Sequence, residues 1–278
     1  MMLLIDSGNT RIKWALAHGK KWLCSGILPV GQAGGLSQHL VTHCAGIDKG
    51  LHDIEQVWVS NVAGKKVELQ LTNFVSDWNV IPHFIVPREE QCGVRNGYSQ
   101  PGQLGSDRWA ALIGAWHLMS EECLVVNCGT ATTIDALSGQ GEFMGGLILP
   151  GVDLMLNSLC DTTAQLAACQ HEKPLMEPLA IRLGEQTTLA KSLVMSGHPG
   201  EYVSFPKNTA DAMFSGVIQA SCGAIQRQHA LLDHDRAPVV LSGGAAEVLQ
   251  EHLHMPLRIA DNLVLQGLLI IAQEASEA

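Results

Sequence analysis

Residues 3–14, with the sequence LLIDSGNTRIKW, decide the expected fold of this chain. The stretch opens with an apolar run suited to a buried strand, and it ends with alternating apolar and basic residues, as the second strand of a hairpin does. The turn between them holds Gly8, which takes positive φ without steric cost, among small hydrogen-bonding residues. The sequence therefore predicts a strand–turn–strand unit whose turn aims several backbone N–H groups into one concavity.

Such a concavity suits an anion, because converging N–H groups carry partial positive charge. Asp6 lies directly before the turn, and an acid beside an anion site becomes favourable when a divalent cation lies between carboxylate and phosphate. Taken alone, the stretch also fits an ordinary tight hairpin with Asp6 as a turn former. Lys13, in the second strand, is either a phosphate ligand or an exposed strand cation.

Residues 124–137, with the sequence LVVNCGTATTIDAL, repeat the same plan. An apolar run is followed by Asn127 in the position of Asp6, by Gly129, by a threonine-rich turn and by a second apolar strand. A third glycine turn, in VVLSGGAA at 239–246, also follows a buried-strand pattern and precedes a helical one. The two hairpins indicate a duplicated fold with both turns facing one cleft, and the third turn offers a place for a nucleoside.

The three turns together resemble the phosphate-1, phosphate-2 and adenosine motifs of the superfamily of acetate and sugar kinases, Hsp70 and actin. This resemblance implies an α/β fold with two duplicated ribonuclease H-like (actin-like ATPase) lobes, at 1–118 and 119–278, and an active site in the interlobe cleft. From Asp6 to about Gly244 the chain is also similar to type III pantothenate kinases. The four further matching segments are Asn96-Gly97-Tyr98 before Pro101, Gly105-Ser106-Asp107-Arg108, GGLILPG at 145–151, and Asn208-Thr209 followed by Ser215-Gly216.

The resemblance implies ATP-dependent phosphorylation of pantothenate to 4′-phosphopantothenate, the first step of coenzyme A biosynthesis. Asp107 would be the general base, Asp6 would orient magnesium through water, and Thr130 would contact ATP from the second lobe. The implied ATP and phosphate site consists of Asp6, Ser7, Gly8, Asn9, Thr10, Arg11, Ile12, Lys13 and Thr130. The implied pantothenate site consists of Tyr98, Gly105, Ser106, Asp107, Arg108 and Thr209, of which the last reaches the substrate across the interface of a homodimer.

Asn127 departs from the family pattern. Most members carry an aspartate there, which helps to bind a potassium or ammonium ion. An amide oxygen still ligates a cation, but the site loses one negative charge. We therefore expect weak or absent activation by potassium.

The residues after Gly105 show the apolar spacing of a helix, which Ser106 is expected to cap. Asp107 and Arg108 then lie in its first turn, where the helix dipole and the neighbouring cation should favour the ionised carboxylate. Such a carboxylate would be a weak base, which a loose transition state tolerates. The plainer interpretation of Asp107 is an acid that only compensates the helix dipole.

Between the motifs, the hydrophobic patterns predict an alternation of strands and helices typical of α/β lobes. Residues 170–205 are longer than the family norm at this point and are expected to be an insertion. The expected strands lie at 22–27, 56–61 and 82–87, and the expected helices at 36–44, 65–78, 154–168, 208–232 and 262–275.

The composition limits the classes of partner. The chain has 278 residues, enough for two cores, and its formal charge of -10 argues against nucleic acid or an anionic membrane as a partner. It shows no apolar run of membrane-spanning length and no signal-peptide pattern at its start, so we expect a cytoplasmic protein. Its cysteines form no Cys-x-x-Cys pair and its histidines show no metal-ligand spacing, so free thiols are expected rather than zinc sites or disulfides.

Two other functions fit parts of the sequence. The nucleotide turns alone fit a kinase for another small alcohol or sugar, whereas the segment from Tyr98 to Arg108 favours pantothenate. Some relatives were first described as accessory factors to a virulence regulator, so a non-catalytic ATP-binding regulatory role is the second alternative. The enzyme is favoured because a regulatory relic has no chemical need for the residues implied in catalysis and substrate binding, which are all present: Asp6, Asp107, Arg108 and Thr209.

Overall fold

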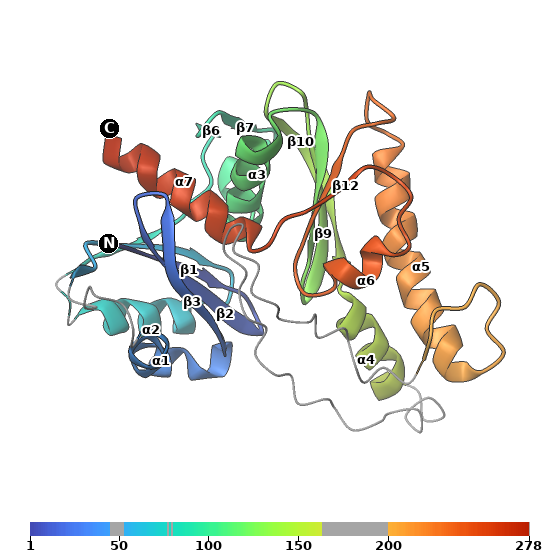
Figure 1. Ribbon diagram of the computed structural model, residues 1–278, viewed down its shortest axis with the longest axis horizontal. Coiled ribbons are helices and arrows are strands. Elements are labelled where there is room, and N and C mark those ends of the chain that lie inside the picture. Colours follow the sequence, from blue (N-terminus) through green and yellow to red (C-terminus); the bar gives the residue numbers. More distant parts are fainter. Residues whose placement is uncertain (45–52, 77, 79, 163–199, 278) are drawn as a thin grey trace.

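A computed structural model describes residues 1–44, 53–76, 78, 80–162 and 200–277. Figure 1 shows two α/β lobes, one formed by the blue and cyan N-terminal strands and one by the green and orange elements that follow. Two helices lie between the sheets and the others cover the outer faces. In the described part of the chain, no helix combines the length and the apolar character needed to cross a bilayer.

The first lobe contains a five-stranded sheet in the order β3-β2-β1-β4-β5. β1 and β3 flank β2 antiparallel, whereas β4 and β5 run parallel to β1. Leu3 and Ile5 join the apolar cluster of the outer helices, and Leu4 between them joins the cluster at the centre of the molecule, as the alternation of a strand buried on both faces requires. The elements are β1 (Met2–Ser7), β2 (Arg11–His18), β3 (Lys21–Pro29), η1 (Val30–Gly35), α1 (Leu36–His43), β4 (Gln56–Asn61), α2 (Lys65–Ser76) and β5 (Pro82–Phe84).

The second lobe contains a seven-stranded sheet in the order β12-β11-β8-β9-β10-β7-β6. Its outer face packs against α4, α5 and α6 through one apolar cluster that includes Leu124, Ile134, Ile218 and Leu249. The elements are β6 (Glu90–Gln91), β7 (Val94–Asn96), η3 (Pro101–Gln103), α3 (Ser106–Met119), β8 (Cys123–Cys128), β9 (Ala131–Leu137), β10 (Glu142–Pro150), α4 (Val152–Thr162), α5 (Thr209–His229), β11 (Val239–Ser242), α6 (Ala246–Gln250), β12 (Leu257–Ile259) and α7 (Leu263–Glu277).

The two sheets repeat one plan, which confirms the duplication predicted from the glycine turns. The strand order β3-β2-β1-β4-β5 corresponds to β10-β9-β8-β11-β12, with antiparallel pairs on one side of the central strand and parallel pairs on the other. Each glycine turn joins the central strand of its repeat to the antiparallel neighbour, β1 to β2 and β8 to β9. The turns therefore occupy equivalent places in the two lobes.

α3 and α7 form the layer between the lobes, and their backbones approach closely at two glycines. A Cβ on Gly267 would lie 1.8 Å from the carbonyl oxygen of Ala110, and one on Gly114 would lie 2.7 Å from that of Leu263. The cluster around them takes Leu4 from the first sheet together with residues of the second. This shared core fixes the N-terminus of α3 relative to both lobes.

Two connections cross the domain division predicted at residue 118. β7 pairs with β10 and β6 pairs with β7, so residues 90–96 extend the second sheet. α7, at the C-terminus, packs on α3 and contacts β1 and β4 of the first sheet. Figure 1 shows α7 reaching over the first lobe. The boundary itself stays a prediction.

The expected strands and helices occur where the patterns indicated, with different ends. The strand expected at 82–87 is shorter, Pro82–Phe84, and the helix expected to reach residue 232 ends at His229. α4 is described as far as Thr162, so residues 163–168 of the expected helix and residues 170–199 of the expected insertion lie outside the described residues.

Candidate active site

The two glycine turns meet across the boundary between the lobes. In each turn the glycine N–H donates to a carbonyl on the far side, from Gly8 to Arg11 at 3.0 Å and from Gly129 to Ala131 at 3.0 Å. The Oγ1 atoms of Thr10 and Thr130 lie 2.8 Å apart, although 120 residues separate them in sequence. Both threonines are exposed. The turns thus lie close enough to contact the same polyphosphate.

Side chains of the first turn differ in what they can offer a ligand. Asn9 and Thr10 are exposed, whereas Ser7 and Ile12 are fully buried. Within the described residues, the hydroxyl of Ser7 has no hydrogen-bond partner. Ser7 and Ile12 can therefore contribute to the nest through backbone groups, and Asn9 and Thr10 also through side chains.

Asp6 and Lys13 are cross-strand neighbours in the β1–β2 pair, so their side chains leave the same face of the sheet. The pKa of Asp6 is raised from 3.8 to about 6. Burial is the largest cause; the charge of Lys13 lowers the pKa and the charge of Asp107 raises it. Asp107, on α3, is therefore close enough to Asp6 for their charges to interact. This coupling joins the acid of the first turn to the acid of the segment at 105–108, called here the substrate motif because the family resemblance implies that it binds pantothenate.

The third glycine turn packs directly behind the second. Gly243 has φ of +96°, and a Cβ there would lie 2.4 Å from the carbonyl oxygen of Cys128. Gly151, the last residue of the 145–151 motif, is equally confined, since its Cβ would lie 2.1 Å from the carbonyl oxygen of Gly129. Only glycine fits at either place without displacing the second turn. The motifs beyond the two phosphate turns thus support the second one.

α3 begins beside the first turn. Ser60 of β4 lies in register with Asp6, and its Oγ lies 3.0 Å from the Oγ of Ser106, both residues being buried. The expectation that Ser106 caps α3 is wrong: Gly105 is the N-cap residue, and the hydroxyl of Ser106 faces Ser60 instead of a helix N–H. Sequence reasoning missed Ser60, which ties the substrate motif to the sheet that carries Asp6.

The expectation that the helix terminus and Arg108 make Asp107 an unusually weak base is also wrong. Burial raises its pKa, and the backbone N–H and charge of Arg108 lower it by less. The Oδ1 atom accepts the backbone N–H of Arg108 at 2.8 Å, whereas the guanidinium is directed elsewhere. The desolvation cost of a half-buried carboxylate therefore exceeds the stabilisation by the helix terminus. A raised pKa makes Asp107 a stronger base than expected.

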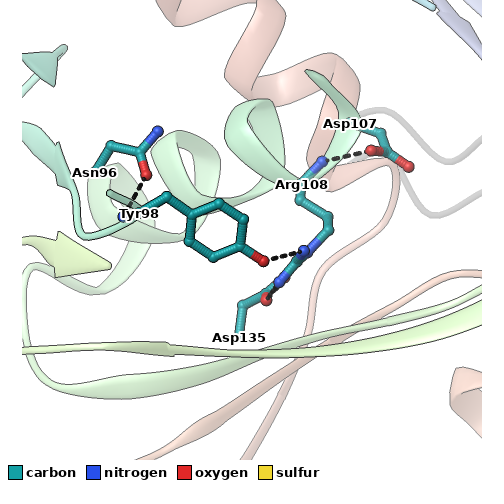
Figure 2. Close-up of polar contacts among 5 residues, drawn as sticks. All are labelled: Asn96, Tyr98, Asp107, Arg108 and Asp135. Carbon is teal, nitrogen blue, oxygen red and sulfur yellow. Dashed lines mark hydrogen bonds and ion pairs between the residues drawn. The ribbon is translucent and has the colours of Figure 1, made fainter. Parts of the chain in front are cut away.

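Arg108 forms a buried ion pair with Asp135 of β9, an acid that the sequence analysis did not single out. The Nε–H donates to both carboxylate oxygens, at 3.2 and 3.1 Å, and Nη2 donates to Oδ1. Nη1 donates to the hydroxyl of Tyr98 at 3.0 Å. Figure 2 shows Tyr98 and Asp135 at the guanidinium and the carboxylate of Asp107 at the backbone end of Arg108. Hydrogen bonds therefore join Tyr98, Arg108 and Asp135, together with Asp107, into one connected network.

A signal for Asp135 was present in the sequence. It is an acid inside an apolar strand, in the run Ile134-Asp135-Ala136-Leu137, and a buried acid must be paired. The sequence could not predict which residue pairs with Asp135, because its partner, Arg108, lies 27 residues earlier on a helix.

Among the described residues, neither Asn127 nor Thr209 forms a hydrogen bond with Tyr98, Arg108 or Asp135. Asn127 is half-buried in β8, in register with Thr133 on one side and Ser242 on the other. Thr209 is the exposed first residue of α5. The N-cap residue of α5 is Asn208, whose Oδ1 accepts the N–H of Asp211 at 2.9 Å.

Comparison with known proteins fits this geometry. The family model described as type III pantothenate kinase matches residues 2–230. The chain belongs to the type III pantothenate kinase family. It is 42% identical over 280 residues to the type III pantothenate kinase of Nitrosospira multiformis, covering 100% of this chain and 93% of the relative. It is 40% identical over 279 residues to that of Aromatoleum aromaticum, covering 100% of both.

Solved structures at lower identity confirm the fold. A Campylobacter jejuni protein described as a Baf family transcriptional activator is 21% identical, with a TM-score of 0.57 over 99% of this chain and 100% of that one. The activator of 2-hydroxyisocaproyl-CoA dehydratase from Clostridium difficile, with bound ADPNP, is 13% identical, with a TM-score of 0.53 over 99% and 96%. At these identities the likeness establishes the two-lobed α/β fold alone.

Proposed function

We propose that the protein transfers the γ-phosphoryl group of ATP to the primary hydroxyl of pantothenate, giving 4′-phosphopantothenate, the first step of coenzyme A biosynthesis. The observation that carries this proposal is the contact of Thr10 with Thr130, with Asp6 and Asp107 electrostatically coupled beside it. Phosphoryl transfer passes through a loose transition state, so alignment and charge neutralisation matter more than covalent help. Two turns on one polyphosphate and an acid beside them supply that alignment.

The first turn suits magnesium bound mainly through phosphate and water. In the described residues no three histidine, cysteine or acidic side chains converge on a metal site. Magnesium in kinases is usually held by one or two carboxylates together with phosphates and waters, so this donor set fits. Asp6 would hold the ion, whose charge would offset that of the phosphates. A nearby cation would also stabilise the ionised carboxylate of Asp6 and so offset the cost of burial, which raises its pKa to about 6.

In this proposal the chain's own residues divide the remaining work. The N–H groups around Gly8, with Lys13 and Thr130, hold the β- and γ-phosphates. Asp107 accepts the hydroxyl proton as it leaves the pantothenate oxygen. Arg108 and Tyr98 bind the pantothenate, whose carboxylate calls for hydrogen-bond donors.

A coupled assay of ATP consumption with purified protein tests the reaction. Pantothenate should stimulate ADP release, and acetate and common hexoses should not. Turnover of a sugar in place of pantothenate would identify a different kinase of the superfamily. ATP binding without turnover of any tested alcohol would favour the regulatory alternative.

We further propose a homodimer in which Thr209 completes the substrate site of the partner subunit. The region before α5 exposes Phe205 to 87%, and β10 exposes Ile148 to 65%, and such exposed apolar side chains are common where protein surfaces meet. Asp107→Asn and Thr209→Ala chains should each be nearly inactive alone. When coexpressed, they should regain about a quarter of the wild-type activity, since half of the dimers are mixed and each has one intact site.

Differently tagged chains allow the mixed dimers to be purified. Purified mixed dimers without activity would show that each site belongs to one subunit. Sedimentation of the wild-type protein as a monomer would exclude the shared site altogether.

We also propose that Asn127 weakens the dependence on monovalent cations. Replacing an organic cation with potassium at constant ionic strength should change kcat/KM by less than about twofold. Asn127→Asp restores the negative charge and should introduce saturable activation by potassium or ammonium. A strong, saturable response of the wild-type protein would contradict the prediction.

A further inference from the structure

The guanidinium of Arg108 is held from three sides. Asp135 accepts from Nε and Nη2, and the hydroxyl of Tyr98 accepts from Nη1. The carbon Cζ lies 5.7 Å from the ring centre of Tyr98 and 5.6 Å from that of Phe143. Arg108 is 5% exposed and Asp135 1%. A long side chain that normally samples many rotamers is therefore confined to one position.

The neighbouring strand is shaped around this pair. Gly146 of β10 lies in register with Asp135, and a Cβ there would lie 2.1 Å from Oδ1 of Asp135 and 3.0 Å from Nη2 of Arg108. Gly97, next to Tyr98, is confined in the same way, since its Cβ would lie 2.1 Å from the carbonyl oxygen of Phe143. In two segments that match the family, a glycine thus leaves room for the Arg108 network because it has no side chain.

The contacts leave two N–H donors of Arg108 unused. A guanidinium carries five N–H donors. The contacts with Asp135 and Tyr98 use three of these, one on each nitrogen, and two on the Nη atoms take no part in them. Asp107, the next residue on α3, has its carboxylate at the backbone end of Arg108. The two unused N–H donors are therefore carried by a residue in the first turn of α3, next to the proposed base Asp107.

We propose that Asp135 is a positioning residue for the substrate: it fixes the rotamer of Arg108 so that the two remaining N–H donors meet the pantothenate carboxylate while the hydroxyl reaches Asp107. This inference rests on the proposed function. Asp135 does not touch the substrate; it acts through Arg108, and through Arg108 on Tyr98. A misplacement of about 1 Å at such a group is enough to lower activity by about 100-fold.

The competing explanation is that the buried pair only supports the fold. Removing one partner of a buried ion pair is strongly destabilising in either case, so stability alone does not distinguish the two roles. A positioning role makes a kinetic difference that a supporting role does not. It raises the KM for pantothenate selectively, and its effect disappears once Arg108 is absent.

Two variants of Asp135 test this. Asp135→Asn removes the charge, and Asp135→Glu keeps the charge but moves the carboxylate by one methylene. Each should raise the KM for pantothenate by about 10- to 100-fold, the usual cost of losing a partner that orients a ligand group, with the KM for ATP changed by less than about threefold. Asp235→Asn, at an exposed acid between α5 and β11, is the matched control and should behave as wild type. If Asp135→Asn does not fold, Asp135→Glu carries the test.

A double-mutant cycle completes the experiment. In an Arg108→Ala background, adding the same Asp135→Asn or Asp135→Glu substitution should change kcat/KM for pantothenate by less than about twofold, because Asp135 then has nothing to position. Equal rises in both KM values, or undiminished effects in the Arg108→Ala background, would overturn the proposal. So would an Asp135→Glu variant with wild-type kinetics. If the wild-type protein fails to phosphorylate pantothenate, the proposed function fails instead, and the two failures are distinguishable.

Discussion

Asp107→Asn should lower kcat/KM for pantothenate by about 10²- to 10⁴-fold, with little change in the affinity for ATP. The carboxylate lies in the first turn of α3 and forms no ion pair among the described residues. Burial raises its pKa, so the ionised form accepts a proton more readily than an ordinary aspartate does. The amide is isosteric but cannot accept that proton. Steady-state ADP release and calorimetric titration of nucleotide measure the two quantities.

The pH profile tests whether the reaction needs the ionised carboxylates. A base must be ionised, so kcat/KM should fall as the pH falls through the raised pKa values of Asp6 and Asp107. Because the two charges interact, the acidic limb belongs to the pair and not to either residue. Asp235→Asn, which removes an exposed acid, should leave the profile unchanged. An Asp107→Asn variant that keeps more than about a tenth of the wild-type kcat/KM would contradict a role as base.

Much of the fold could be predicted because its signals are local. A glycine turn between two apolar runs specifies a hairpin, and its recurrence at 124–137 specifies the second lobe. The structure confirms the consequence that both sheets share one strand order. The packing of the interlobe helices was harder to predict from the sequence, because the contact of α3 with α7 depends on Gly114 and Gly267, which are far apart in the chain.

The electrostatics of the site could not be predicted from neighbours in sequence. Arg108 follows Asp107 directly, which suggested that its charge would favour the ionised acid. In the fold the guanidinium reaches across to Asp135 on β9, and burial then outweighs the other influences on the pKa of Asp107. Ser106 was expected to cap a helix by the same local logic, and it contacts Ser60 of another strand instead. Local patterns identified these residues, and long-range packing decided what they do.

Asp6→Asn should raise the free energy of unfolding near neutral pH while it removes phosphoryl transfer. The folded protein raises the pKa of Asp6 from 3.8 to about 6, so folding disfavours its ionised form. This residue therefore contributes stability that is fully present below about pH 4 and is lost as the pH rises through about 6. A shift of this size corresponds to about 3 kcal/mol, and solvent contact at the edge of the site reduces the expected gain to about 1–3 kcal/mol.

Denaturant unfolding without magnesium or nucleotide measures this effect. The difference between Asp6→Asn and wild type should be largest above about pH 7 and should vanish well below pH 4, where Asp6 is protonated in both folded and unfolded chains. Other carboxylates titrate over the same range, but those that do not interact with Asp6 cancel in the difference, which leaves Asp6 and its coupling to Asp107. Asp235→Asn should show no such pH-dependent gain, because its side chain is exposed.

The sign of the result decides between two views of the first turn. If Asp6→Asn destabilises the protein at neutral pH, Lys13 stabilises the carboxylate by more than burial costs, and the Asp6–Lys13 pair is a structural feature of the β1–β2 hairpin. If the variant is more stable and inactive, the fold retains a costly buried charge that function alone explains. Saturating magnesium and ATP should then stabilise the wild-type protein more than the variant, because ligand binding adds stability only where the ligand can bind. That reversal would link the unfavourable charge of Asp6 directly to the ion and phosphates it is proposed to hold.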